Sequence, residues 1–124
     1  MDENVPTSAG LSSYNLLDEK LFMKALELQH GHTVLELGCG VGNYVMAIAP
    51  YLGDSGHILA LDLWNEGIET LRVRADMQRM DNLLPVAADI CAGLPVRRGS
   101  VDCCLMSTVI HIPESVTAIR SLLA

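Results

Sequence analysis

Apolar residues recur along this chain with two spacings, and segments of the two kinds alternate. Compact aliphatic runs predict strands at residues 33–37, 57–63, 83–88 and 101–109. Apolar positions three or four residues apart predict helices at residues 16–29, 43–52, 66–80 and from Pro113 to Ala124. Strands that alternate with helices are joined by right-handed crossovers, so the pattern predicts an α/β fold with a mainly parallel sheet.

The length of 124 residues leaves room for one domain. Residues 1–13 are rich in Ser, Thr, Gly and Pro and lack periodicity, which predicts a flexible N-terminal arm before a domain at residues 14–124. The N-terminus has no basic and apolar signal region, and no apolar run approaches the roughly 18 residues of a membrane span. We therefore expect a cytoplasmic protein that does not enter a membrane.

A glycine-rich turn follows the first predicted strand. Residues 34–43 read VLELGCGVGN, so that Gly38, Gly40 and Gly42 occupy alternate positions. Glycine is needed where the backbone turns at positive φ, or where a ligand comes too close for a Cβ atom. Such a turn between a strand and a helix is typical of a nucleotide-binding site.

Acidic residues stand at or beside the ends of three successive predicted strands: Glu36, Asp62 and Asp89. Because parallel strands present their carboxyl ends at one edge of the sheet, we expect the three acids to converge on one crevice. Asp62 follows Gly42 by 20 residues, a separation typical of an acid that accepts hydrogen bonds from ribose hydroxyls. A solvated aspartate at a strand end is the alternative.

These motifs resemble those of the class I S-adenosylmethionine-dependent methyltransferases, over residues 16–124. The similar segments are ELGCGVG at 36–42, LDL at 61–63, ADI at 88–90 and SVDCCLMS at 100–107. The resemblance implies a Rossmann-like three-layer α/β/α fold, S-adenosylmethionine as the cofactor, and methyl transfer as the activity. It also implies that the glycine turn packs against the methionine part, that Asp62 holds the ribose diol, and that Asp89 and the next N–H read the adenine edge.

The cofactor-binding residues expected from the resemblance are Glu36, Gly38, Cys39, Gly40, Gly42, Asn43, Asp62, Leu63, Asp89, Ile90 and Ser107. Ser107 and His111 follow the fourth strand and are candidates for contacting the methyl acceptor. His111 could act as a general base, and a loop histidine bonded to the backbone is the alternative. The spacing of Cys and His predicts no metal site.

An NAD-dependent oxidoreductase is the main rival. Such enzymes usually carry Gly-x-Gly-x-x-Gly, whereas the third glycine here comes one residue early, at Gly42. A carboxylate at Glu36 would repel a pyrophosphate but suits a sulfonium cation, which favours the methyltransferase.

The net charge of −7 favours a small-molecule acceptor over a nucleic acid, since phosphate binding relies on Lys and Arg. Arg72, Arg74 and Arg79 are interleaved with acids in the predicted helix 66–80, and we interpret them as a solvated face.

The fold of the class I methyltransferases continues with further strands after the fourth, whereas this sequence stops after the next predicted helix. Three explanations stay open: a fragment of a longer enzyme, a sheet completed by self-association, or a half-domain without catalysis, such as the partner subunit of an active enzyme. A fourth strand with an open edge would allow a homodimer to form through it.

Overall fold

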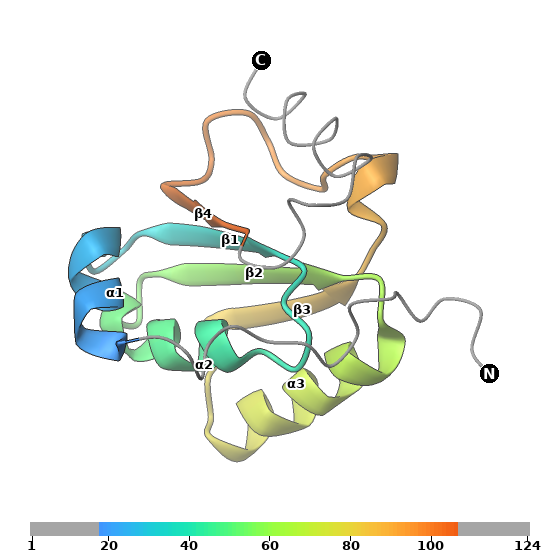
Figure 1. Cartoon of the computed structure of the whole chain (residues 1–124), viewed down its shortest axis with the longest axis horizontal. Helices are drawn as coiled ribbons and strands as arrows, with labels where there is room; N and C mark the ends of the chain where they lie inside the picture. Colours follow the sequence, from blue (N-terminus) through green and yellow to red (C-terminus); the bar gives the residue numbers. More distant parts are fainter. Residues whose placement is uncertain (1–17, 107–124) are drawn as a thin grey trace.

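The computed structural model describes residues 18–106, which form a four-stranded parallel sheet with helices packed on it (Figure 1). The strand order is β3-β2-β1-β4, with β1 at Thr33–Leu37, β2 at His57–Asp62, β3 at Leu83–Ala87 and β4 at Cys103–Leu105. The helical elements are α1 at Glu19–Leu26, α2 at Asn43–Ile48, η2 at Ala49–Leu52, α3 at Asn65–Met77 and η3 at Ile90–Ala92. The predicted α/β fold with a parallel sheet is confirmed.

Several predicted boundaries extend too far. Helix α1 ends at Leu26 rather than at 29, because Glu27 takes the left-handed conformation at φ 51°. Helix α2 ends at Ile48, and the chain continues as the 3₁₀ turn η2, which carries Pro50 near its start. Strands β2 and β3 each end one residue early, and β4 begins two residues late, at Cys103. The predicted arm at 1–13 and the helix after Pro113 lie outside the described residues.

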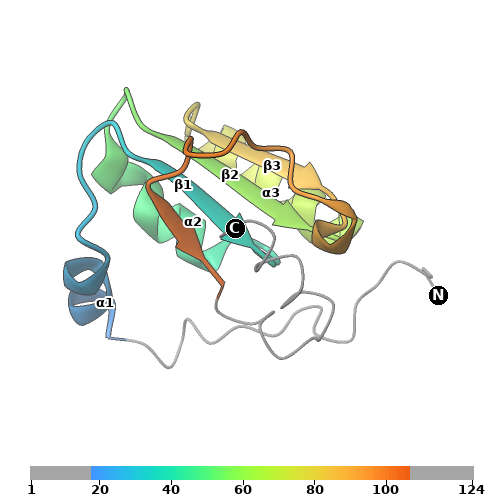
Figure 2. The ribbon, with the colours of Figure 1, turned by 90° about the horizontal axis from the view of Figure 1, so that it is seen from above.

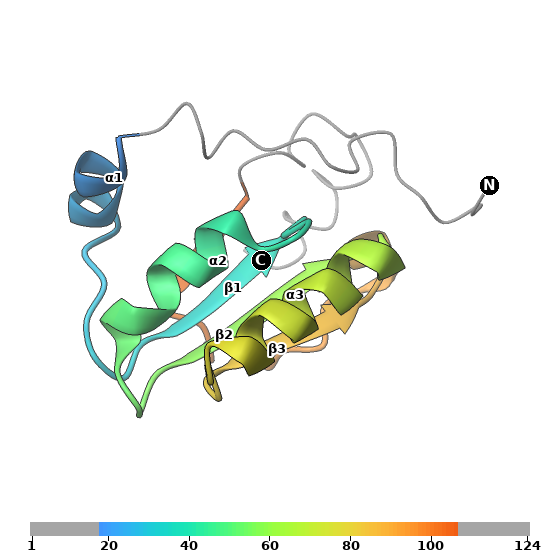
Figure 3. The ribbon, with the colours of Figure 1, turned by 90° about the horizontal axis from the view of Figure 1, so that it is seen from below.

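Alternate strand residues point to opposite sides of the sheet, so the residues of one strand contribute to two buried clusters, one on each face. Val34 and Ile58 belong to a buried cluster with residues of α2 and α3. Figure 3 shows these two helices lying side by side on that face. Leu35 and Leu61 belong to a second cluster with η3 and the connection at 93–102, which crosses the opposite face (Figure 2).

Helix α3 ends at Met77, three residues before the prediction, through a Schellman motif. The Arg79 N–H donates to the Asp76 carbonyl at 3.1 Å, and the Met80 N–H donates to the Ala75 carbonyl at 2.9 Å. Arg79 occupies the left-handed position of this motif, with φ 53°, where glycine is the usual residue.

Replacing Arg79 with glycine is expected to raise the free energy of unfolding by about 0.5–1 kcal/mol, because glycine adopts positive φ without a Cβ clash. Urea denaturation of the wild type and Arg79→Gly measures this. Arg98→Gly serves as the control, since Arg98 is exposed and is not among the described residues with positive φ. An Arg79→Gly variant no more stable than the wild type would contradict the expectation.

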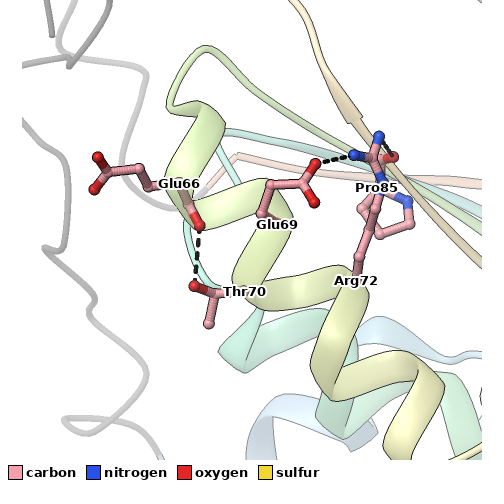
Figure 4. Close-up of polar contacts among 5 residues, drawn as sticks. All are labelled: Glu66, Glu69, Thr70, Arg72 and Pro85. Atoms are coloured by element: carbon pink, nitrogen blue, oxygen red, sulfur yellow. Dashed lines mark hydrogen bonds and ion pairs between the residues drawn. The ribbon is translucent and has the colours of Figure 1, made fainter.

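The outer edge of β3 is closed to further strand pairing. Ile58 N–H donates to the Asn82 carbonyl and Ala88 N–H donates to the Asp62 carbonyl, so even-numbered residues of this segment pair with β2 and Pro85 faces outward. Proline has no N–H to offer, and the Pro85 carbonyl accepts a hydrogen bond from Arg72 Nη2 at 3.3 Å (Figure 4).

Strand β4 has β1 as its neighbour among the described residues. A homodimer formed through the other edge of β4 stays a prediction.

Candidate functional site

The strand register brings the glycine turn and the strand-end acids to one edge of the sheet. Leu37 of β1 pairs with Leu61 of β2, so Gly38 follows at the level of Asp62. Asp62 in turn pairs with Ala87 of β3, which places Asp89 just beyond the same edge. This carboxyl edge is where open α/β sheets bind their ligands.

All three glycines of the turn have left-handed backbone angles, with φ 78° at Gly38, 56° at Gly40 and 87° at Gly42. A Cβ atom on Gly42 would lie 2.2 Å from Leu71 Cδ1, so this glycine lets the turn pack against α3. A Cβ atom on Gly40 would meet no described residue within 4 Å. The turn is therefore packed on one side and has open space beside Gly40.

Asp62 ties the end of β2 to this turn. Its Oδ2 accepts a hydrogen bond from the Gly40 N–H at 2.7 Å, and its Oδ1 accepts one from the Trp64 N–H at 2.8 Å. The Leu61 carbonyl accepts from the Gly38 and Cys39 N–H groups at 2.8 and 3.0 Å. Each carboxylate oxygen has about two acceptor sites, so Asp62 can still accept hydrogen bonds from ligand hydroxyls.

Glu36 carries a buried carboxyl group with one oxygen that lacks a hydrogen bond in the described part of the chain. Its side chain is 1% exposed, and among the described residues its Oε2 is buried without a hydrogen bond. Burial raises the pKa of Glu36 well above its ordinary value, and the nearby Asp62 carboxylate raises it further. A cation bound beside these two acids would stabilise both charges.

Cys39 is also buried within the turn. Burial raises the pKa of its thiol, and the charges of Glu36 and Asp62 add to the effect. The thiol therefore stays protonated, and its place is in the packing of the turn rather than in nucleophilic chemistry.

Arg74 contacts the turn, contrary to the interpretation of Arg72, Arg74 and Arg79 as a solvated face. Its Nη1 donates to the Val41 carbonyl at 2.7 Å and to Asn43 Oδ1 at 3.2 Å. The spacing from Leu71 could have predicted this contact. Arg74 follows Leu71 by three residues, residues three apart share a helix face, and Leu71 lies in the core.

The other two arginines are exposed, in agreement with that interpretation, and Arg72 forms an ion pair with Glu69. Arg72 reaches the Pro85 carbonyl, and Arg79 lies beyond the end of α3.

Three more predicted residues, Leu63, Asp89 and Ile90, lie at the same edge in different environments. Leu63 is 41% exposed beside Asp62, and its apolar side chain is open to a ligand. Asp89 caps η3, accepting a hydrogen bond from the Cys91 N–H at 2.9 Å. The Ile90 side chain packs in the second core cluster, so its backbone rather than its side chain is available for recognition. Ser107 and His111 lie outside the described residues.

Trp64 is a further residue at this edge. A Cβ atom on Gly67 would lie 2.5 Å from Trp64 Cε3, so the indole ring packs against the first turn of α3 where glycine leaves room.

A cavity of about 600 Å³ lies away from this site. It is lined by η2, the start of β2 and the segment between α3 and β3, including His57, Arg79 and Asn82. These elements meet at the amino edge of the sheet, so the cavity is separate from the glycine turn and its acids.

Residues 34–124 match the model of a protein family described as a methyltransferase domain. The chain belongs to this family. The match begins in β1 and includes the glycine turn and all three strand-end acids. The resemblance inferred from the motifs is thereby confirmed.

Curated relatives of this methyltransferase domain are longer than the chain. It is 28% identical over 104 residues to an uncharacterised 37.1 kDa protein of transposon TN4556 from Streptomyces fradiae, covering 82% of this chain and 29% of the relative. It is 24% identical over 106 residues to the catalytic subunit of a tRNA (adenine(58)-N(1))-methyltransferase from Yarrowia lipolytica, covering 85% of this chain and 27% of the relative. The chain thus spans less than a third of either protein.

Among solved structures, the methyltransferase domain is similar to a SAM-dependent methyltransferase from Aquifex aeolicus. The TM-score is 0.76 at 20% identity, over 95% of this chain and 62% of that one. The likeness confirms the Rossmann-like fold. That protein is named as dependent on SAM, S-adenosylmethionine.

The residues at the site fit that cofactor. The unpaired Oε2 of Glu36, with Asp62 nearby, suits a ligand that carries positive charge, and the open side of Gly40 leaves room for it. In residues 18–106, no group of three or more Cys, His, Asp or Glu is arranged to hold a metal ion. No helix in this part of the chain has the length and apolar character to cross a membrane.

Proposed function

We propose that this chain is the cofactor-binding part of an S-adenosylmethionine-dependent methyltransferase, with the cofactor held at the carboxyl edge of the sheet. The observation that carries the proposal is the buried Glu36 carboxyl, whose Oε2 has no hydrogen-bond partner among the described residues, beside a glycine turn that Asp62 fastens to β2. A pyrophosphate would place two negative charges next to these acids. A ligand with a sulfonium and an ammonium group would place positive charge there.

Each predicted residue has a proposed part in holding the cofactor. Gly38, Gly40 and Gly42 allow the turn, with Cys39 and Asn43, to approach the methionine part. Asp62 accepts hydrogen bonds from the ribose hydroxyls, and Leu63 packs against the adenosine. The Asp89 side chain and the Ile90 N–H read the adenine edge, and Ser107 contributes from beyond the described residues.

Methyl transfer to a nucleophile needs little from the protein beyond orientation of the reactants and exclusion of water. S-adenosylmethionine, when bound, supplies an electrophilic methyl group and a neutral thioether leaving group. The chain's own residues hold it in one orientation and keep water from the site. Ser107 and His111 stay candidates for contacting the acceptor, with His111 as a base for its proton.

The proposed acceptor is a small molecule without negative charge. The chain carries 8 Lys and Arg against 15 Asp and Glu, and Arg74 already donates to the turn. The relative named as a tRNA methyltransferase makes RNA the rival acceptor. A methylation assay with total RNA and a panel of small amines, phenols and thiols separates the two.

A half-domain that binds the cofactor without catalysing is the second candidate function. The observation that favours it is that Glu36, Asp62 and the glycine turn, the groups proposed to hold the cofactor, lie together within the described residues. Methyl transfer by the 124-residue chain alone to any acceptor of the panel would exclude this candidate.

Calorimetric titration with S-adenosylmethionine, S-adenosylhomocysteine and NAD in one buffer tests the cofactor assignment. We expect micromolar binding of the first two and none of NAD. Preference for NAD would instead support the oxidoreductase. A folded chain that binds none of the three would contradict the proposal for this chain.

A further inference from the structure

Arg74 makes two hydrogen bonds that join α3 to the glycine turn. Its Nη1 donates to the carbonyl of Val41, which lies between Gly40 and Gly42, and to the side chain of Asn43, the first residue of α2. Arg74 is half-buried, so these bonds are partly shielded from water. A charged donor makes stronger hydrogen bonds than a neutral one.

The turn depends on such outside contacts for its shape. Glycine has more backbone freedom than any other residue, and three glycines here hold left-handed angles. Gly42, the residue that caps α2, has no side chain to fix the start of that helix. The turn is therefore held from two sides, by Asp62 at the Gly40 N–H and by Arg74 at the Val41 carbonyl.

We propose that Arg74 is a positioning residue, which holds the glycine turn in the shape that binds the cofactor. The inference rests on the proposed function for the identity of the cofactor. The effect of Arg74 on the shape of the glycine turn does not depend on that identity. Arg74 acts through Val41 and Asn43 rather than by touching the cofactor. With the bond to Val41 in place, that carbonyl faces the guanidinium of Arg74 from α3.

Arg72 provides a matched control on the same helix. It lies two residues before Arg74 and also donates to a backbone carbonyl, but that carbonyl is Pro85 of β3 (Figure 4). Loss of a guanidinium from α3 is thus common to Arg72→Met and Arg74→Met. Only Arg74→Met removes contacts with the turn.

The first measurement is the affinity of the full chain for S-adenosylmethionine by calorimetry. Arg74→Met is expected to weaken binding about tenfold, equivalent to about 1.4 kcal/mol, and Arg72→Met by less than about twofold. Arg74→Lys keeps a charged donor on a shorter side chain and is expected to recover part of the loss. Urea denaturation of each variant gives the change in overall stability separately.

The second measurement is the ¹H–¹⁵N spectrum of the protein without ligand. Arg74→Met is expected to shift or broaden the amide signals of Gly38, Gly40 and Gly42, and Arg72→Met to leave them in place. A purely structural role would lower stability without moving these three signals at temperatures well below unfolding.

Both effects are required, so affinity within about twofold of the wild type, or unmoved glycine signals, would overturn the inference. If the wild type binds no S-adenosylmethionine, the proposed function fails. The glycine signals then decide the role of Arg74 by themselves: movement supports it as the residue that holds the turn, and no movement overturns it.

Discussion

Asp62→Ala is expected to weaken binding of S-adenosylmethionine by about 1–3 kcal/mol, measured by calorimetry. The substitution removes the acceptor proposed for the ribose hydroxyls. It also removes the acceptor of the Gly40 and Trp64 N–H groups, so that only the Leu61 carbonyl still joins the turn to the end of β2 by the hydrogen bonds described above. Affinity and the free energy of unfolding should therefore both fall.

Two variants separate these effects. Asp62→Asn keeps one side-chain oxygen and should retain more stability than Asp62→Ala, while losing the negative charge. Asp54→Ala is the matched control, because Asp54 is an exposed acid in the turn before β2, at the opposite edge of the sheet. Unchanged affinity in a folded Asp62→Ala protein would remove Asp62 from the proposed site.

Without ligand, the free energy of unfolding should fall as the pH rises above the ordinary pKa of a glutamate, because of Glu36. Burial and the Asp62 charge raise the pKa of Glu36 in the folded state, whereas in the unfolded chain the pKa is ordinary. The folded protein thus holds a proton that the unfolded chain has released. Stability is fully present below the ordinary pKa and is lost as the pH rises toward the raised one, by about 1.4 kcal/mol per pH unit.

Urea denaturation across this pH range tests the expectation with Glu36→Gln, which does not titrate and should lose this slope. Glu66→Gln is the control, since Glu66 is exposed at the start of α3 and should keep the wild-type slope. Within residues 18–106, the titratable groups that interact with Glu36 are Asp62 and the Cys39 thiol. Equal slopes for the wild type and Glu36→Gln would show that Glu36 does not carry a raised pKa.

The sequence predicted the order of the elements well, because each strand has a short aliphatic run and each helix an apolar face. It predicted helix ends poorly, since these depend on local backbone geometry. The left-handed angles of Glu27 and Arg79 end α1 and α3 without glycine, and neither residue type signals such an end.

The strand-end acids and the glycine turn could be placed at one edge because parallel pairing fixes that placement. Their environments could not be predicted. Whether the Oε2 of Glu36 finds a partner depends on packing around β1, and the bonds of Arg74 depend on how α3 lies beside α2. Charge pattern along one helix cannot separate a solvated arginine from one that reaches a neighbouring element.

The closed outer edge of β3 also limits where another strand can pair with the sheet. A foreign strand laid against it would meet a proline ring and a guanidinium instead of alternating donors and acceptors. Fibril-like stacking of copies through this side is therefore disfavoured even in concentrated solution. Dyes or surface attachments for biophysical work belong on the β3 side, where they do not interfere with strand pairing.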